Sequence, residues 1–349
     1  MAILYVTEQG VYLVKKEERI EVRKDEQRLQ SIPVDALDQI VLFGNVGLSA
    51  PLRNYLLDQN VDTVFLTRSG RFRGRLTSYS GANIELRREQ FRRIDDPEFA
   101  LQTSRRFVKG KIGNCRVLLQ RHQRRNQNVD ISRGLLRLRG IVQKLDSAQN
   151  VEQLRGFEGE AGAVYFPCLS EVINVPEFRF RRRSRRPPLD PFNSVISFGY
   201  TMLLSSVMTA VQTVGLEPYL GFLHTSANGK PAVGLDLMEE FRALLVDSLA
   251  VRMVNRKQLD VSDFTIQSGA SFSEEVDENR VLTKADYPVL MGRLSIRKWL
   301  ALYNEQLDKK LEYPRYGKRL KVKQIILEQA RLLARHIRGQ EEYEAFVIR

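Results

Sequence analysis

The hydrophobic pattern of this 349-residue chain changes its period near residue 85, and this change limits the folds open to it. Before that point, short β-rich runs are separated by turn signals such as Gln9-Gly10 and Ser69-Gly70. After it, apolar residues recur at helical spacing, first over residues 97–125. The pattern predicts an α+β protein in which a small β-rich N-terminal domain (residues 1–84) precedes a larger all-α domain (residues 85–349).

The same patterns give approximate element boundaries in both domains. In the first domain, strands are expected over residues 3–7, 11–15, 19–23, 39–43, 62–67 and 72–77. A helix is expected after Ser49-Ala50-Pro51, where a capping serine precedes an early proline. In the second domain, helices are expected over residues 97–125, 131–145, 151–173, 193–213, 234–254, 283–308 and 319–338, the third of them following Ser147-Ala148-Gln149-Asn150. The polar segment 255–282 is expected to hold a short hairpin.

The chain carries a large excess of positive charge. Lys and Arg number 55 against 42 Asp and Glu, giving a net charge of +13 and a pI near 9.8. The simple alternative is charge that serves solubility, but the basic residues cluster, which favours a nucleic-acid partner. The densest run has six arginines within residues 178–186, and Arg suits bidentate phosphate contact. The expected DNA-binding arginines are Arg179, Arg181, Arg182, Arg183, Arg185 and Arg186.

Other features limit the cellular setting. The two cysteines, Cys115 and Cys168, fit neither a zinc site nor a disulfide framework, so buried reduced thiols are expected. No apolar run approaches the roughly 18 residues of a membrane span. The first residues lack the basic region of a signal peptide. We therefore expect a cytoplasmic protein with no membrane partner.

One of the three histidines lies close to a group of acids. His224 ends a short apolar run, and a helix with Asp236, Glu239 and Glu240 follows it. Upstream, residues 156–162 supply another acid at a helix start, either Glu158 or Glu160. These two point to different sides of a helix, and the small residues that follow favour Glu158 only slightly. One imidazole with two or three carboxylates makes a hard N/O site suited to Mn²⁺ or Mg²⁺.

A structural explanation competes with the metal site. Acids at a helix start complement the helix dipole, and Glu239 is spaced to pair with Arg242. Asp236, Glu239 and Glu240 also lie off the apolar stripe that is expected to be buried. A lone histidine near apolar residues is more often hydrogen-bonded structure than a ligand. Taken one at a time, these residues favour the structural explanation.

Taken together, the same segments resemble a known family. Residues 156–159, 219–224 and 236–242 resemble three motifs of the CRISPR-associated integrase of spacer acquisition, CRISPR-associated protein one. Residues 186–193 resemble the segment that lies beside its active site. Each motif alone is loose, but the ordered set extends over essentially the whole chain.

This resemblance implies a site and partners. It implies that Glu158, His224 and Glu239 bind Mn²⁺ or Mg²⁺, with Asp236 as a supporting acid nearby. It places Asn193 among the DNA-contacting residues beside the site. It also implies a homodimer paired through the β-rich domain, and CRISPR-associated protein two as a bridging partner.

The resulting hypothesis is a metal-dependent DNA endonuclease and integrase. A DNA 3′-hydroxyl would attack a phosphodiester in the CRISPR repeat and insert a spacer, and water would give hydrolysis instead. Since no covalent enzyme intermediate is needed, Tyr165 is expected to be a packing residue. Two alternatives stay open: a metal-dependent DNA-repair nuclease without an integrase role, and a non-catalytic DNA-binding protein whose acids cap helices.

Overall fold

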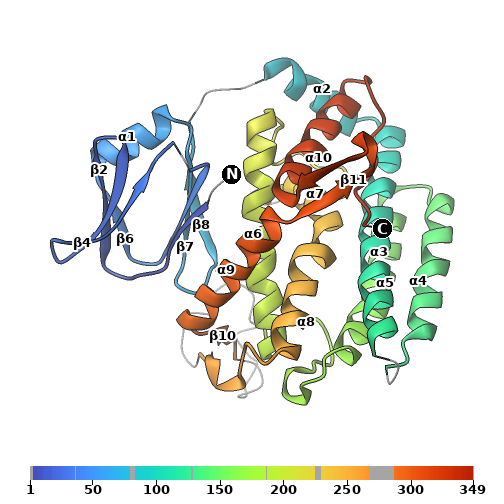
Figure 1. The fold of residues 1–349 in the computed structure, drawn as a ribbon. Helices are drawn as coiled ribbons and strands as arrows, with labels where there is room; N and C mark the ends of the chain where they lie inside the picture. Colours follow the sequence, from blue (N-terminus) through green and yellow to red (C-terminus); the bar gives the residue numbers. More distant parts are fainter. Residues whose placement is uncertain are drawn as a thin grey trace, which may run out of the picture.

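The computed structural model has a strand-rich N-terminal part beside a larger helical part (Figure 1). It describes residues 3–35, 37–78, 83–126, 129–185, 187–224, 229–267 and 287–348. The arrangement confirms the α+β class and the order of the two parts. The exact division at residue 84 stays a prediction.

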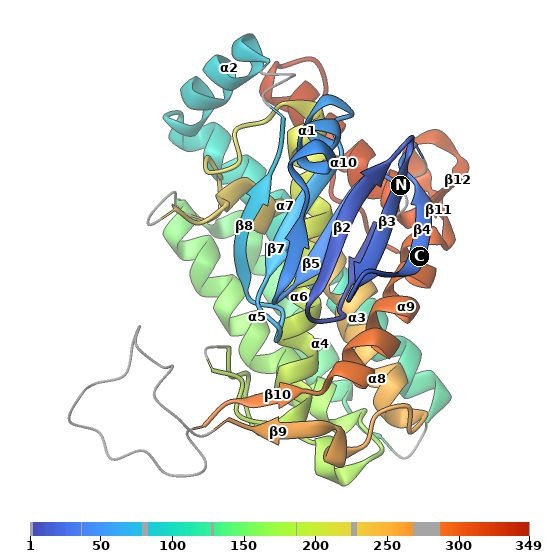
Figure 2. The ribbon, with the colours of Figure 1, turned by 90° about the vertical axis from the view of Figure 1, so that its left-hand side faces the viewer.

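Two four-stranded sheets form the N-terminal part (Figure 2). The first sheet has the order β1 (Ile3–Val6), β5 (Gln39–Phe43), β7 (Asp62–Leu66) and β8 (Phe72–Leu76). The second has the order β4 (Gln27–Pro33), β3 (Arg19–Lys24), β2 (Val11–Lys16) and β6 (Val46–Leu48). Helix α1 (Ala50–Asp58) begins at the expected cap, where the Ser49 side chain accepts a hydrogen bond from the Leu52 amide. Strands β4 and β6 were not predicted.

The first sheet is covered on both faces, which explains why every residue of β5 is buried. One face shares a small core with the second sheet and α1, including Leu13 and Leu56. The other face joins the main core, where the Phe43 and Phe198 rings lie 6.1 Å apart. The N-terminal part is therefore packed firmly against the helices.

The helical part contains nine α-helices within the described residues. They are α2 (Ile84–Ile94), α3 (Pro97–Arg125), α4 (Ser132–Lys144), α5 (Val151–Glu171), α6 (Pro191–Val214), α7 (Ala232–Phe241), α8 (Ser248–Asn255), α9 (Arg293–Asp308) and α10 (Val322–Ile337). Two hairpins accompany them: β9 (Phe264–Ile266) with β10 (Val289–Met291), and β11 (Lys310–Tyr313) with β12 (Lys318–Lys321). The expected helix over 283–308 begins only at Arg293, because β10 pairs with β9 just before it. Helix α2 and the β11–β12 hairpin were not predicted.

The expected helix over 234–254 is interrupted. Residues Arg242–Asp247 form a π-helical segment, η4, between α7 and α8. Such segments are rare and recur at functional sites. Here the segment begins with Arg242, whose side chain lies beside the candidate site.

Among the described residues, helix α6 is long and apolar enough to cross a membrane by length and composition alone. However, 72% of its apolar 18-residue window is buried inside the protein, as in a core helix of a soluble domain. The cysteines match expectation only in part: both are free thiols, and Cys115 is buried while Cys168 is half-buried.

Candidate active site

Three helices bring two of the predicted acids into contact with the ammonium group of one lysine. Glu158 lies on α5, Glu239 on α7 and Lys111 on α3. The Lys111 ammonium contacts Glu158 Oε1 directly and lies 2.8 Å from Glu239 Oε2. The Glu239 side chain is only 3% exposed, whereas that of Glu158 is 25% exposed. Two carboxylates that are 81 positions apart in the chain therefore share a half-open site.

His224 is held beside these acids by Asp236. The buried Asp236 carboxylate accepts hydrogen bonds from the Phe222, Leu223 and His224 amides, at 2.6, 3.0 and 2.9 Å. It also lies 2.7 Å from His224 Nδ1. Because a carboxylate can only accept, Nδ1 carries the proton and Nε2 has a free lone pair. That Nε2 lies 3.9 Å from Glu239 Oε1.

Gly221 allows the loop to approach α7 this closely. A Cβ at this position would lie 2.8 Å from Asp236 Oδ2 and 2.7 Å from the Ala232 carbonyl carbon. Both distances are shorter than van der Waals contact, and one neighbour is backbone that cannot swing aside. The glycine is therefore required for the amides of residues 222–224 to reach Asp236.

The acids of α7 are buried, which corrects their predicted position off the buried stripe. Asp236, Glu239 and Glu240 are all at most 3% exposed. Burial opposes ionisation of Glu239, but the nearby charges of Arg242 and Lys111 lower its pKa to about 2. Arg242 Nε lies 3.0 Å from Glu239 Oε2, as the competing structural explanation anticipated. Glu239 is therefore a permanent negative charge at physiological pH.

Glu240 points to a different neighbour, the C-terminal tail (residues 339–348). Its carboxyl group accepts hydrogen bonds from the Phe346 amide, the Tyr343 hydroxyl and the Gln329 amide group, at 2.6, 3.0 and 3.0 Å. Burial outweighs these donors and raises its pKa to about 8. Glu240 thus fastens the tail to the helix that carries Glu239.

The donor chemistry fits a divalent cation. Two carboxylates and one imidazole match a hard mixed site, and a carboxylate on the second nitrogen of His224 is the usual partner of a metal-bound histidine. Among the described residues, no group of three or more His, Cys, Asp or Glu lies close enough together to hold a metal ion, and the Lys111 ammonium contacts both Glu158 and Glu239. Glu160 makes no hydrogen bond or ion pair with any described residue.

The arginine-rich segment divides into two kinds of residue. Arg179, Arg181, Arg182 and Arg185 are exposed, and their charge is available to a polyanion. Arg183 is half-buried and donates to Asn193 Oδ1 and Ser197 Oγ, at 2.8 and 3.0 Å. Arg186 lies outside the described residues.

The predicted DNA contact at Asn193 needs correction. Its side chain is completely buried. Its Nδ2 donates to the Arg182 carbonyl and to Asp190, while its Oδ1 accepts from Arg183 and the Ser184 amide. All its hydrogen-bonding capacity is used to shape the loop, so its role here is to position the arginines.

Tyr165 is buried, as expected of a packing residue. Its hydroxyl donates to Asp247 Oδ2 at 2.7 Å, and the Tyr200 hydroxyl donates to Asp247 Oδ1 at the same distance. Burial raises the pKa of both tyrosines well above 10. Both hydroxyls hold Asp247, the last residue of the π-helical segment.

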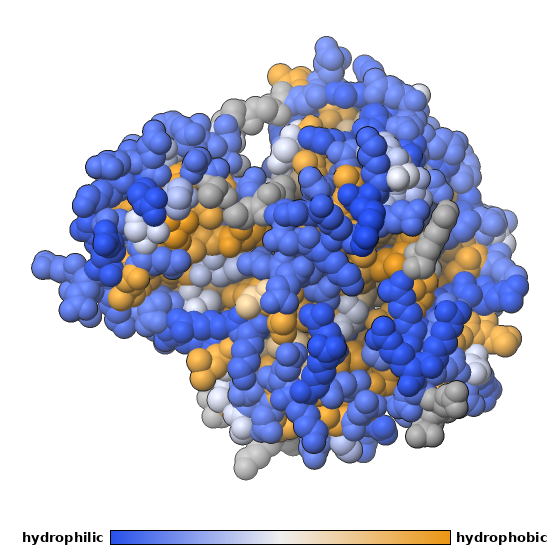
Figure 3. All heavy atoms as spheres, viewed as in Figure 1, coloured by the Kyte–Doolittle hydropathy of each residue, from blue (hydrophilic) through white to orange (hydrophobic). Residues whose placement is uncertain are grey.

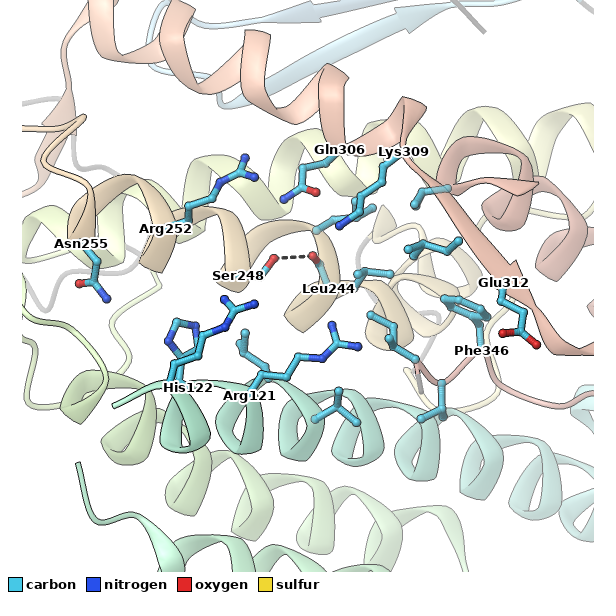
Figure 4. Close-up of a pocket in the computed structure, with 18 of the residues that line it drawn as sticks. Arg121, His122, Leu244, Ser248, Arg252, Asn255, Gln306, Lys309, Glu312 and Phe346 are labelled. Atoms are coloured by element: carbon cyan, nitrogen blue, oxygen red, sulfur yellow. Dashed lines mark hydrogen bonds between the residues drawn. The ribbon is translucent and has the colours of Figure 1, made fainter. Parts of the chain in front are cut away.

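A second cationic feature is a pocket of about 510 Å³ between α3, α8, the end of α9 and the C-terminal tail (Figure 4). The basic side chains that line it are Arg121, Arg125, Arg252, Arg256 and Lys309. Glu312 is the acid among the described lining residues. Burial and the charge of Arg256 lower the pKa of Arg252, and Arg252 Nη2 is buried without a hydrogen-bond partner in the described chain. Hydrophilic residues also cover much of the face of the protein that is drawn in Figure 3.

Sequence reasoning missed two residues that touch the predicted acids, Lys111 and Arg242. A signal for Lys111 was present, because it stands four residues after Phe107 and four before Cys115. Both of those neighbours are buried. A lysine on a buried helical stripe needs an acidic partner. Arg242 had been considered only as a surface partner of Glu239.

Comparisons with known proteins agree on one family. The family model of CRISPR associated protein Cas1 matches residues 4–286. The CRISPR-associated endonuclease Cas1 1 of Chlorobaculum tepidum is 35% identical over 353 residues, which cover 99% of this chain and 98% of that protein.

Solved structures share the fold. A casposase bound to integration product superposes with a TM-score of 0.84 at 20% identity, covering 99% of this chain and 93% of that one. A chain of a Cas6-RT-Cas1–Cas2 complex superposes with a TM-score of 0.81 at 22% identity. That match covers 99% of this chain and 36% of the other.

Proposed function

This chain belongs to the CRISPR-associated Cas1 family, and from that premise we propose that it is a metal-dependent DNA integrase and endonuclease that inserts spacers into a CRISPR array. The single observation that best supports this is the convergence of Glu158, Glu239 and the Asp236-held His224 in a strongly basic protein. The same convergence would be unnecessary in a protein whose acids only cap helices.

The proposed reaction is transesterification. A DNA 3′-hydroxyl attacks a phosphodiester of the repeat, a new P–O bond forms, and the old 3′-oxygen departs with a proton. A divalent ion, Mn²⁺ or Mg²⁺, held by Glu158, His224 and Glu239 would supply charge neutralisation at the phosphate. Asp236 keeps His224 in the tautomer with a free Nε2. Arg242 keeps Glu239 ionised.

The basic pocket is proposed to bind the DNA backbone near this site. Five cations and one described acid leave it with excess positive charge, and the buried, unpartnered Arg252 Nη2 is a donor without an acceptor. Phosphate oxygens are acceptors of the right charge. The exposed arginines of the 179–185 segment would extend the contact.

Neutralising two arginines of the pocket tests this assignment. In the double variant Arg252→Gln/Arg256→Gln, the magnitude of the slope of log K against log salt should fall by about 1.8, the value for two lost phosphate contacts on duplex DNA. The measurement is fluorescence anisotropy with a labelled duplex at several salt concentrations. The control, Arg28→Gln/Arg53→Gln in the N-terminal part, removes the same charge from exposed positions. Equal slope changes in both doubles would count against a specific role for the pocket.

An integration assay tests the proposed function itself. The protein, a prespacer duplex and a plasmid with a repeat should give joined products with Mn²⁺ or Mg²⁺, and chelator should abolish them. Cleavage without joining would favour the repair-nuclease alternative. DNA binding with neither reaction in any divalent ion would favour the non-catalytic alternative.

Partners follow from the same proposal. Integration at two separated positions needs two active sites, which a symmetric homodimer would supply. Cas2 is proposed as the bridging partner, because a chain with this fold was solved in a complex whose name contains Cas1 and Cas2. We also infer that the protein works in the cytoplasm, where its DNA substrates are.

A further inference from the structure

Lys111 is placed unusually for a lysine. Its side chain is 14% exposed, and its ammonium touches carboxylates of two different helices. Because one carboxylate belongs to α5 and the other to α7, the ammonium forms an electrostatic link between the two helices.

The charges at this point are already balanced. Glu158 and Glu239 contribute two negative charges, and Lys111 and Arg242 contribute two positive ones. A divalent cation on the same carboxylates would raise the local charge to +2 if both cations stayed. Because like charges repel strongly in a half-buried site, one of the two cations must leave.

Lys111 is the cation that is free to move. Arg242 is confined, because its guanidinium lies 4.5 Å from the centre of the Tyr200 ring and its Nε lies 3.0 Å from Glu239 Oε2 on the same helical stretch. The backbone beside Lys111 is also fixed, since Gly110 packs directly against Ala345 of the C-terminal tail. The Lys111 side chain, however, is a flexible stem that ends at the half-exposed carboxylate of Glu158.

We propose that Lys111 is the built-in counter-ion of this site, which neutralises Glu158 and Glu239 before a divalent cation binds and releases them when it does. This inference rests on the proposed metal site. It predicts that Lys111 lowers the affinity of the protein for divalent cations while it stabilises the cation-free fold.

The test compares Mn²⁺ binding and thermal unfolding in the full chain and in Lys111→Met. By calorimetry, the variant should bind Mn²⁺ at least about tenfold more tightly, because no ammonium has to be displaced. In chelator its melting temperature should fall below that of the unmodified protein, and saturating Mn²⁺ should close most of this gap. Lys109→Met, an exposed lysine on the same helix, should change neither quantity.

Each outcome has a distinct meaning. Unchanged or weaker Mn²⁺ binding by Lys111→Met would overturn the inference and leave the proposed integrase standing. Absence of Mn²⁺ binding in every variant would overturn both the inference and the metal-dependent function. If Lys111→Met does not fold, Lys111→Gln keeps a donor toward the carboxylates without the charge and should show the same gain in affinity. Lys111→Arg, which keeps the charge, should show no gain.

Discussion

Glu158→Gln is expected to reduce both DNA cleavage and spacer joining at least about a thousandfold, equivalent to about 4 kcal/mol of transition-state stabilisation. The substitution keeps the size of the side chain and its contact with Lys111, but it removes one of the two negative charges at the half-open site. Of the two carboxylates at the site, that of Glu158 is the one that solvent and substrate can reach more easily, because it is 25% exposed against 3% for Glu239. Loss of its charge should therefore affect chemistry far more than folding.

Glu160→Gln is the matched control for this prediction. It lies two residues further along α5, is also partly exposed and makes no contact with the described acids or cations. Its activity should remain within about twofold of the unmodified protein. The measurements are initial rates of cleavage and joining at saturating Mn²⁺, together with melting temperature and DNA affinity, both of which should be nearly constant. An inactive Glu160→Gln together with an active Glu158→Gln would show that the acid of the site is Glu160 and that the assignment of Glu158 is wrong.

The comparison of these two acids shows what the sequence could and could not decide. Helical periodicity placed both on one helix start, and their neighbours differed little in size. The deciding fact is three-dimensional: α5 turns Glu158 toward Lys111 of α3, a residue 47 positions earlier. No local pattern contains that distance, so the small neighbouring residues favoured Glu158 only slightly and the choice depended on the family resemblance.

The fold was predictable where one face of an element meets water. Strands such as β2 and helices such as α3 and α10 have alternating or periodic burial, and their bounds matched to within a few residues. Helix α7 is different because α3, α6 and the C-terminal tail enclose it. Acidic side chains normally predict a position that faces water. The acids of α7 are instead buried, because partners from other parts of the chain offset the cost of burying their charge.

The π-helical segment was not predictable for a related reason. Its residues, Arg242 to Asp247, have helical composition, and a single continuous helix over 234–254 satisfied their pattern equally well. What singles the segment out are tertiary contacts at its two ends: the Arg242 guanidinium packs on the Tyr200 ring, and Asp247 accepts from the Tyr165 and Tyr200 hydroxyls. These contacts come from other helices and leave no local trace in the sequence of the segment.

Glu240→Gln is expected to remove a large pH dependence of stability. The carboxyl has an ordinary pKa near 4.5 when unfolded and about 8 when folded. Between those values the native protein holds a proton that the unfolded chain has released. The stabilisation is therefore complete below pH 4.5 and disappears as the pH rises through 8. The full difference corresponds to at most about 5 kcal/mol.

The neutral amide of Glu240→Gln resembles the protonated acid and cannot ionise. Its oxygen can accept from the Phe346 amide, and the Tyr343 hydroxyl can turn to accept from its nitrogen. The variant should match the unmodified protein near pH 5 and exceed it above pH 8. Urea unfolding between pH 5 and 9 in the presence of chelator measures this difference without any contribution from bound metal.

An acid on the C-terminal tail itself, Glu341, provides the control. Hydrogen bonds from Arg315 and Arg335 lower the pKa of this partly exposed carboxyl group. The stabilisation that Glu341 contributes is present above about pH 4.5 and is lost only as the pH falls further. Glu341→Gln should therefore leave the pH dependence of the unfolding free energy between pH 5 and 9 unchanged. If Glu240→Gln retained the original pH dependence, Glu240 would be ionised across this range. The tail would then be held by three donors on a carboxylate, and α7 would carry a second permanent negative charge next to Glu239.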